Sequence, residues 1–289
     1  MSYSISHRLF NCSLRLLSSK WRKNFPDSYF KAVAESYQIL DRILKVTVRG
    51  HEFQIVIESE TSRVRAERMP DHEPDTLDWI ETFAPNDVFW DIGSNIGLFS
   101  LYAAKARGVQ VVAIDPLPHN HSGIVRNLAL NKLTAKVTPL CVAISAKVEI
   151  GQLYVPTESD TPGGGNVPFG QNTDNYGREV QQRYALQTIG MSVDDLLTIL
   201  PVPFPNHIKL DIDGIQQKVI EGALKTLADT RVKSLMLELQ PQNYRAIIEL
   251  MQNIGFNYTK CAATRRGDKP EPDRGDTNHF FVRSHRAGQ

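Results

Sequence analysis

The sequence predicts an α/β fold, in which helices cover both faces of a mostly parallel sheet and an N-terminal α/β extension precedes it. Two observations support this prediction. After Asn86, short apolar runs alternate with helical patterns, strand–helix–strand–helix–strand. Acids and glycines also gather where these runs end, and ligands of parallel sheets bind beyond the carboxyl ends of the strands. With 289 residues, 41% of them hydrophobic, the chain can bury the core that such a sheet needs.

Strands are expected where apolar runs stand between turn residues. The runs read "DVFWDIG", "VQVVAIDP", "KVTPLCVAIS", "NHIKLDIDG", "RVKSLMLELQP" and "NHFFVR". They cover residues 87–93, 109–116, 136–145, 206–214, 231–241 and 278–283. Because right-handed crossovers join parallel strands, the carboxyl ends of the strands should lie along one edge of the sheet.

Helical patterns fill the intervals between these runs. They cover residues 97–106, 119–132, 191–200, 215–228 and 243–256. Ser192 is expected to cap the third of these helices at its N-terminus, and Gly255 is expected to close the last one.

Residues 1–80 are expected to form the N-terminal extension, and residues 81–289 the domain that contains the sheet. The elements expected in the extension are a helix over 28–44, a strand over 53–59 and a helix that begins at Pro74. Asp75 and Asp78 stand in the first turn of that last helix, where the helix dipole favours negative charge.

The beginning of the sequence is basic. Arg8, Arg15, Lys20, Arg22 and Lys23 occur before the first acid, Asp27. Three interpretations compete: a packing helix, a membrane-surface helix and a transit peptide. The packing helix is favoured, and a secretory signal is disfavoured because arginines interrupt the apolar stretch.

Residues 156–182 form an irregular insertion that is rich in Gly, Asn, Pro, Asp and Gln. Loops of this length inside a compact domain are typical of lids, substrate loops or disordered tracts. We expect acceptor recognition here, around Phe169, Gly170 and Asn172, with the loop folding over the site.

Composition excludes several classes of protein. A net charge of +1 argues against a protein that coats nucleic acid. Cys12, Cys141 and Cys261 are far apart and form no metal-binding spacing, which predicts a reducing, cytoplasmic compartment. No apolar run reaches the length of a membrane span, so no transmembrane segment is expected.

Four residues at the ends of the first two runs predict an adenosine-type ligand. Asp91 ends the first run, and Gly93 and Gly97 let the backbone turn sharply and approach a ligand. Asp115 ends the second run, 22 residues after Gly93 (115 − 93), about the spacing at which an acid reaches ribose hydroxyls.

The charge of this loop distinguishes between ligands. Its glycines are spaced GxxxG, whereas nicotinamide dinucleotide sites use GxGxxG and place a pyrophosphate on the helix N-terminus. The carboxylate of Asp91 would repel phosphate and attract a cation. S-adenosylmethionine has a ribose and an adenine with a sulfonium and a protonated amine, so it is the predicted cofactor.

Four segments, "FWDIGSNIGLFSLYAA", "AIDPLPHNHSGIVRNLALN", "IKLDIDGIQQKVIEGA" and "LMLELQP", resemble in this order the FkbM family of S-adenosylmethionine-dependent methyltransferases. The resemblance extends from about Glu73 to Arg283. It implies a class I methyltransferase fold, which is Rossmann-like, and methylation of a hydroxyl oxygen.

Several cofactor-binding residues follow from this resemblance. The positions that match the cofactor loop are Asp91, Gly93, Asn95 and Gly97. Asp115 stands where the family usually has Glu, in the role of binding the ribose hydroxyls. Asn127 and Asn131 match two asparagines of the following helix, with capping or surface polarity as the alternative. By position, Cys141 and Val142 should lie near the adenine.

The segment "KLDIDG" predicts the catalytic residues. Lys209, Asp211 and Asp213 share one side of a strand by alternation, and an unpaired buried acid would be costly. Asp211 is the first candidate to position or deprotonate the acceptor, and Lys209 the residue that orients Asp211 or the acceptor. For Asp213, capping of the next helix is an equal alternative.

No metal is predicted, with one weaker alternative. Asp211, Asp213 and Glu238 together could hold a hard divalent cation through oxygen ligands. One departure from the family bears on catalysis: Gln216 stands where the family usually places an acid, and an amide cannot act as a base.

The predicted function is therefore an S-adenosylmethionine-dependent O-methyltransferase that acts on a hydroxyl of a small molecule, a sugar or a lipid-linked glycan. The alternatives are an N-methyltransferase and a methyltransferase-fold binding module without catalysis, which Gln216 keeps open. The fold alone does not separate these alternatives.

Overall fold

The computed structural model describes residues 18–39, 42–173, 177–212, 215–263, 269–273 and 275–284. The chain divides into two compact units, Met1–Arg42 and Ile43–Gln289. The first unit contains helix α2 (Pro26–Ile39), and the side chains of Trp21, Phe25 and Phe30 are exposed. Because Arg8 and Arg15 lie outside the described residues, the three interpretations of the basic segment stay predictions.

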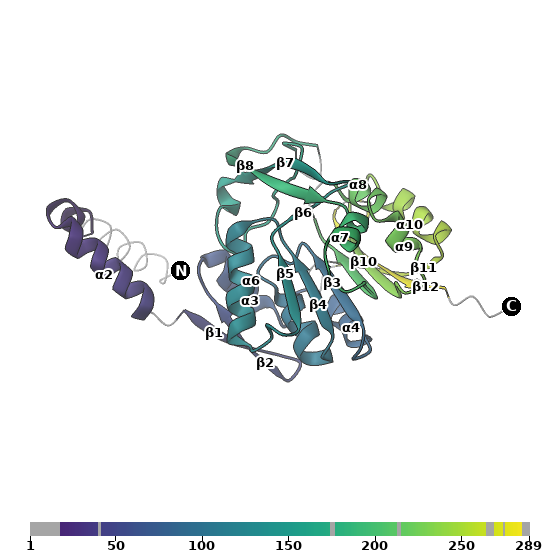
Figure 1. Cartoon of the computed structure of the whole chain (residues 1–289), viewed down its shortest axis with the longest axis horizontal. Coiled ribbons are helices and arrows are strands. Elements are labelled where there is room, and N and C mark those ends of the chain that lie inside the picture. The colour runs from purple at the N-terminus through teal and green to yellow at the C-terminus, as the bar shows by residue number, and fades with distance from the viewer. Residues whose placement is uncertain are drawn as a thin grey trace. The chain divides into compact units, whose positions relative to one another are not determined.

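The second unit is built on a seven-stranded sheet in the order β11-β12-β10-β9-β3-β4-β5 (Figure 1). Its strands are β3 (Val88–Ile92), β4 (Gln110–Ile114), β5 (Val137–Leu140), β9 (His207–Leu210), β10 (Ser234–Leu239), β11 (Phe256–Ala262) and β12 (Thr277–Arg283). Five of them pair in parallel, and β12 pairs antiparallel with both β10 and β11. The predicted mostly parallel α/β sheet is confirmed.

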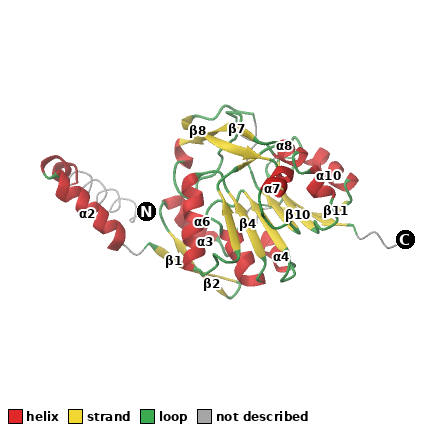
Figure 2. Ribbon diagram, viewed as in Figure 1, coloured by secondary structure: helices red, strands yellow, loops and turns green. Residues whose placement is uncertain are grey.

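Helices cover both faces of this sheet because neighbouring strand residues point to opposite sides. Phe89 faces one core, with α4 (Pro74–Glu81), α5 (Leu98–Tyr102), the π-helix η1 (Ala103–Arg107) and α6 (Pro118–Leu130). Trp90 faces the other, with α7 (Val193–Ile199), α8 (Gln216–Glu221), α9 (Leu224–Ala228) and α10 (Tyr244–Asn253). Figure 2 shows the yellow strands between α6 on one side and α8 and α10 on the other.

A second sheet lies above the carboxyl end of β5. It contains β6 (Ala143–Ile144), β7 (Glu149–Pro156) and β8 (Gln182–Met191), which Figure 1 shows at the top of the view. Strands β7 and β8 pair antiparallel, and the irregular segment between them begins with the short 3-10 helix η2 (Thr157–Ser159). The sequence analysis did not predict β7 or β8.

A hairpin of β1 (Ile43–Val48) and β2 (His51–Val56) precedes helix α3 (Glu60–Arg68). The side-chain oxygens of Asn131 and Asn127 accept hydrogen bonds from the backbone amides of Gln54 (3.0 Å) and Val56 (2.9 Å). These two asparagines, which match the family, therefore hold the hairpin against α6.

Several predicted boundaries need correction. The helix expected over 28–44 ends at Ile39, and β1 begins at Ile43. The helix expected over 215–228 is split into α8 and α9 at Gly222, where a Cβ would lie 2.8 Å from the Ser145 carbonyl oxygen. Helices α4 and α7 are confirmed, with Pro74 in the first turn and Ser192 as the N-cap.

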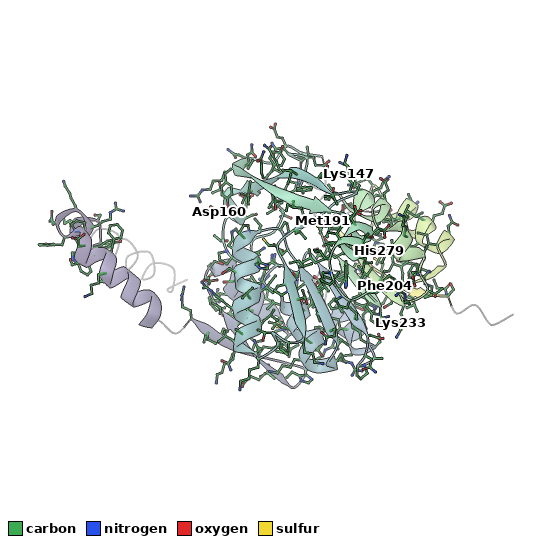
Figure 3. The ribbon with its side chains drawn as sticks, in the orientation of Figure 1. Lys147, Asp160, Met191, Phe204, Lys233 and His279 are labelled. Carbon is green, nitrogen blue, oxygen red and sulfur yellow. The ribbon has the colours of Figure 1, made fainter. Side chains whose placement is uncertain are left out.

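A buried polar network closes the amino end of the sheet. His207 Nδ1 lies 2.7 Å from Ser234 Oγ, and His207 Nε2 lies 2.9 Å from Asp87 Oδ2. Trp79 donates to Ser234, and Lys233, labelled at the lower right of Figure 3, pairs with Asp87. Burial lowers the pKa of His207 to about 4, although the Asp87 carboxylate opposes the shift.

This network makes a pH-dependent contribution to stability. The unfolded chain protonates His207 near its ordinary pKa of 6.5, whereas the folded chain resists protonation down to about 4. The stabilisation is therefore complete above pH 6.5 and is lost as the pH falls to 4. In urea unfolding, the advantage of wild type over His207→Gln should shrink by roughly 3 kcal/mol across this window. Parallel pH curves for the two proteins would contradict this account.

Candidate active site

The loop between β3 and α5 begins the site. Gly93, Asn95 and Gly97 all have positive φ angles, of 81°, 52° and 83°. At Gly93 a Cβ would lie 1.7 Å from the backbone oxygen of Asp211, so only glycine lets the two strand ends come this close. The loop thereby passes directly beside the residue that follows β9.

Asp91 lies behind this loop at the end of β3. Its side chain is fully buried, Ser100 Oγ donates to its Oδ2 (2.6 Å), and its Oδ1 has no hydrogen-bond partner among the described residues. Burial raises the pKa of Asp91, and the charge of Lys209 opposes this rise. Asp91 lines neither of the cavities described below, so its charge acts on the site from behind.

Asp115 follows β4 and is held by three donors. Its Oδ1 accepts from the backbone amide of Leu117 (3.0 Å) and from Asn120 Nδ2 (3.2 Å), and its Oδ2 accepts from the amide of Asn95 (2.9 Å). An ionised carboxylate accepts about four hydrogen bonds, so one position remains on Oδ2. Burial raises the pKa of Asp115 to about 7, against these hydrogen bonds.

Lys209 and Asp211 form an ion pair at the end of β9. Lys209 Nζ lies 2.6 Å from Asp211 Oδ2 and 5.1 Å from the centre of the Phe99 ring, and Lys209 is buried. Burial alone would raise the pKa of Asp211, but the Lys209 ammonium outweighs it and the pKa is lowered. Asp211 is therefore an ionised hydrogen-bond acceptor and a weak base.

Two of the three residues of the metal alternative, Asp211 and Glu238 of β10, are in contact, whereas Asp213 lies outside the described residues. Among the residues described, no group of three or more His, Cys, Asp or Glu side chains has a metal-binding arrangement. The metal alternative therefore stays a prediction.

Two cavities meet at Gly93. One contains about 470 Å³ of empty space, including space open to solvent, and we call it the polar cavity because charged residues line it together with apolar ones; its lining includes Arg65, Glu73, Asn95, Phe99, Lys209 and Asp211. The other, of about 340 Å³, is apolar and is lined by Ile114, Pro116, Val142, Val167, Phe169 and Ile212 among others. Val142 lines this apolar cavity, and the neighbouring Cys141 has its Sγ 3.6 Å from the Pro116 carbonyl oxygen; their place near the adenine stays a prediction.

The insertion lies against the loop between β3 and α5. Asn95 Nδ2 donates to the Gly164 carbonyl (2.7 Å), and Asn120 bridges Asp115 and the same carbonyl (3.1 Å). Phe169 reaches the apolar cavity from a slot over the second sheet, where a Cβ on Gly151 or Gly190 would lie within 2.7 Å of its ring.

Sequence reasoning did not select Arg65, Glu73 or Asn120. Glu73 had one available signal, since it stands directly before Pro74 at a predicted helix start. Gln216, flagged as a departure from the family, is buried in α8 and its Nε2 donates to the Ile212 carbonyl. It lines neither cavity, so its amide supports the turn after β9.

A mostly parallel sheet in this order, with a glycine loop after its central strand and an acid after the neighbouring strand, is typical of class I, S-adenosylmethionine-dependent methyltransferases. The chain belongs to the FkbM methyltransferase family, because the Methyltransferase FkbM domain matches residues 91–258, more than half of the chain. The predicted family and enzyme class are confirmed.

Two characterised relatives are methyltransferases. Methyltransferase sdnD of Sordaria araneosa is 27% identical over 207 residues, which cover 64% of this chain and 79% of that protein. Hexuronic acid methyltransferase AglP of Haloferax volcanii is 25% identical over 151 residues, 51% of this chain. The match spans about half of AglP, 54% of its length.

Solved structures with a similar fold include other methyltransferases. The tRNA m1G37 methyltransferase of M. jannaschii has a TM-score of 0.45 and 14% identity, covering 84% of this chain and 57% of that one. Precorrin-6y C5,15-methyltransferase of Geobacter metallireducens has a TM-score of 0.42 and 13% identity, covering 72% and 85%. Similarities this weak say nothing about the acceptor.

The contact at Gly93 predicts the effect of a single methyl group. Gly93→Ala should destabilise the chain by about 1–3 kcal/mol more than Gly50→Ala, because its Cβ meets the Asp211 backbone. Gly50 is the matched control, since it also has a positive φ but has no atom within 4 Å of the added Cβ. Denaturant unfolding measures both. Equal losses would show that Gly93 is needed only for its backbone angle.

Proposed function

We propose that this enzyme transfers a methyl group from S-adenosylmethionine to an oxygen of a small molecule, a sugar or a lipid-linked glycan. The observation that supports the cofactor assignment is the pair of cavities that share Gly93. Asp115 lines neither cavity, but it adjoins Pro116 of the apolar cavity and accepts a hydrogen bond from the amide of Asn95 of the polar one. A nucleoside that carries an amino acid has the same division into an apolar and a charged half.

The residues fit the adenosine half of the cofactor. The apolar cavity, with Pro116, Val142 and Phe169, would hold the adenine ring. The open position on Asp115 Oδ2 would accept a hydrogen bond from a ribose hydroxyl. A second ribose hydroxyl would have to replace Asn120 on Oδ1.

When bound, the cofactor supplies a methyl carbon that its sulfonium has activated. The chain then has to bring the acceptor oxygen into line with that carbon and exclude water. Asp211, kept ionised by Lys209, would accept a hydrogen bond from the acceptor and orient it. This assigns positioning to Asp211 ahead of deprotonation, since a carboxylate with a lowered pKa is a poor base near neutral pH.

The oxygen acceptor is supported by similarity. AglP is described as a hexuronic acid methyltransferase, and hexuronic acids offer hydroxyl and carboxylate oxygens. Of these, a hydroxyl is the acceptor that fits ionised Asp211, because it can donate a hydrogen bond to that carboxylate, whereas an ionised carboxylate has no proton to donate and would be repelled.

Calorimetric titration with S-adenosylmethionine and S-adenosylhomocysteine tests the cofactor assignment. Wild type should bind both, and Asp91→Ala should bind more weakly, because the acid behind the loop no longer attracts the cation. The exposed Glu67→Gln is a matched control for the lost charge. Absence of binding by wild type would reject the proposed function.

Cofactor affinity should depend on the ionisation of Asp115. The pKa of this buried acid is raised to about 7, and only the ionised form keeps all its acceptor positions. S-adenosylhomocysteine should therefore bind about tenfold more weakly at pH 6 than at pH 8. In Asp115→Asn, titrations at the two pH values should agree. The same pH dependence in that variant would assign it to another group.

Turnover tests the role of Asp211. With radiolabelled S-adenosylmethionine and a panel of uronic acids, sugars and glycans, wild type should label an acceptor. Asp211→Asn should lower kcat by about 10- to 1000-fold, because the amide no longer attracts Lys209 or accepts as strongly. Full activity in Asp211→Asn would remove this residue from the mechanism.

A further inference from the structure

Two residues of opposite charge line the polar cavity and have no part in the mechanism above. Arg65 comes from α3, and Glu73 stands directly before α4. Both precede residues 91–258, which match the family domain. Their arrangement points to a ligand that carries a positive and a negative group close together.

Glu73 is a buried carboxylate in a fixed position. Thr76 Oγ1 (2.9 Å) and Asn278 Nδ2 (3.0 Å) both donate to its Oε2, and only 5% of the residue is exposed. Its Oε1 lies 3.2 Å from His72 Nε2. The backbone has φ 47° and ψ 61°, a left-handed conformation that costs a non-glycine residue about 1–2 kcal/mol. Several contacts thus hold this carboxylate at the wall of the cavity.

Arg65 is held from one side only. Its Nε donates to the Gly163 carbonyl (2.6 Å), which fixes the plane of the guanidinium. Its two Nη groups have no hydrogen-bond partner among the residues that the structure describes. The guanidinium is close enough to Asp115 and Asp211 to act electrostatically on both. It therefore lies near the proposed ribose site with donors to spare.

We propose that Arg65 and Glu73 form a binding site for the amino-acid end of the cofactor. The Arg65 Nη groups would donate to its carboxylate in the bidentate geometry that guanidinium favours, and Glu73 would accept from its ammonium. This inference rests on the proposed function. It also gives the ammonium a direct partner, which Asp91 cannot be because it does not line the cavity.

The polar cavity is suited to this end of the ligand and the apolar cavity is not. Gly93 belongs to both cavities, so a ligand that crosses it would reach Pro116 and Val142 on one side and Arg65 and Glu73 on the other. A free amino-acid zwitterion would gain little here, because the adenosine half supplies the apolar contacts. The site should therefore discriminate between nucleosides that carry the amino acid and those that lack it.

Two ligands separate the contribution of the amino-acid end of the cofactor to affinity from that of the adenosine end. S-adenosylhomocysteine carries the amino-acid group, and 5′-methylthioadenosine keeps the adenine, ribose and sulfur without it. Titration of both into wild type, Glu73→Gln and Arg65→Gln measures the affinity of each half. Arg63→Gln and Glu67→Gln, on the exposed side of the same helix α3, are matched controls. Thermal unfolding establishes that each variant is folded.

Glu73→Gln and Arg65→Gln should each weaken S-adenosylhomocysteine by about 10- to 100-fold, the usual loss of a charged hydrogen bond. Both variants should bind 5′-methylthioadenosine within about twofold of wild type, and the controls should change neither ligand. If both ligands weakened equally, Arg65 and Glu73 would have a structural role and the inference would be wrong. Unchanged binding of S-adenosylhomocysteine would also overturn the inference. Arg65 and Glu73 would then be assigned to binding of the acceptor.

The same titration separates this inference from the function on which it rests. If wild type bound both ligands with equal affinity, the proposed amino-acid site would be rejected, whereas the cofactor assignment would be kept. If wild type bound neither ligand, both would fall together.

Discussion

The buried Lys209 ammonium is the interaction on which the rest of the site depends. Burial opposes its charge, yet Asp211, Glu73 and Asp91 together raise its pKa, so it stays protonated. The charge of Lys209 thereby compensates three carboxylates: Asp91 of β3, Asp211 after β9 and Glu73 before α4. Removing one partner of a buried ion pair typically costs about 3–5 kcal/mol, because the remaining charges lose their compensation. Lys209 thus provides the positive charge that compensates the acids gathered at this edge of the sheet.

The central part of the sheet and its glycine loop could be predicted from the sequence because their signals are local. Strands β3, β4 and β9 are buried on both faces, so they read as apolar runs, and Asp91 and Asp115 mark their ends. Strands β7 and β8 escaped prediction because they belong to a separate sheet and carry polar side chains on the exposed face. Strand β11 belongs to the main sheet, but it was not predicted because polar, exposed residues interrupt its apolar pattern.

The polar cavity could not be predicted, because its walls come from distant segments. Arg65 and Glu73 are close in sequence but far from Lys209, and they reach the edge of the sheet only through the packing of α3 and α4. Asn278, which holds Glu73, comes from the antiparallel strand β12. Lys209 could be selected from its alternating position in "KLDIDG", but Arg65, Glu73 and Asn278 have no spacing that marks them as part of a site. The interpretation of Gln216 needed the structure for a different reason: an amide that faces a cavity and one that bonds a carbonyl read identically in the sequence.

Phe169 connects the second sheet with the apolar cavity. Its ring enters the slot left by Gly151 and Gly190, and the same ring lines the apolar cavity. Phe169 therefore anchors the loop between β7 and β8 on its own hairpin, while Asn95, Asn120 and Arg65 donate hydrogen bonds to the Gly163 and Gly164 carbonyls of the same loop. Because Gly151 and Gly190 have no side chains, the ring can sink into the second sheet, so two residues that do not line the apolar cavity set its width.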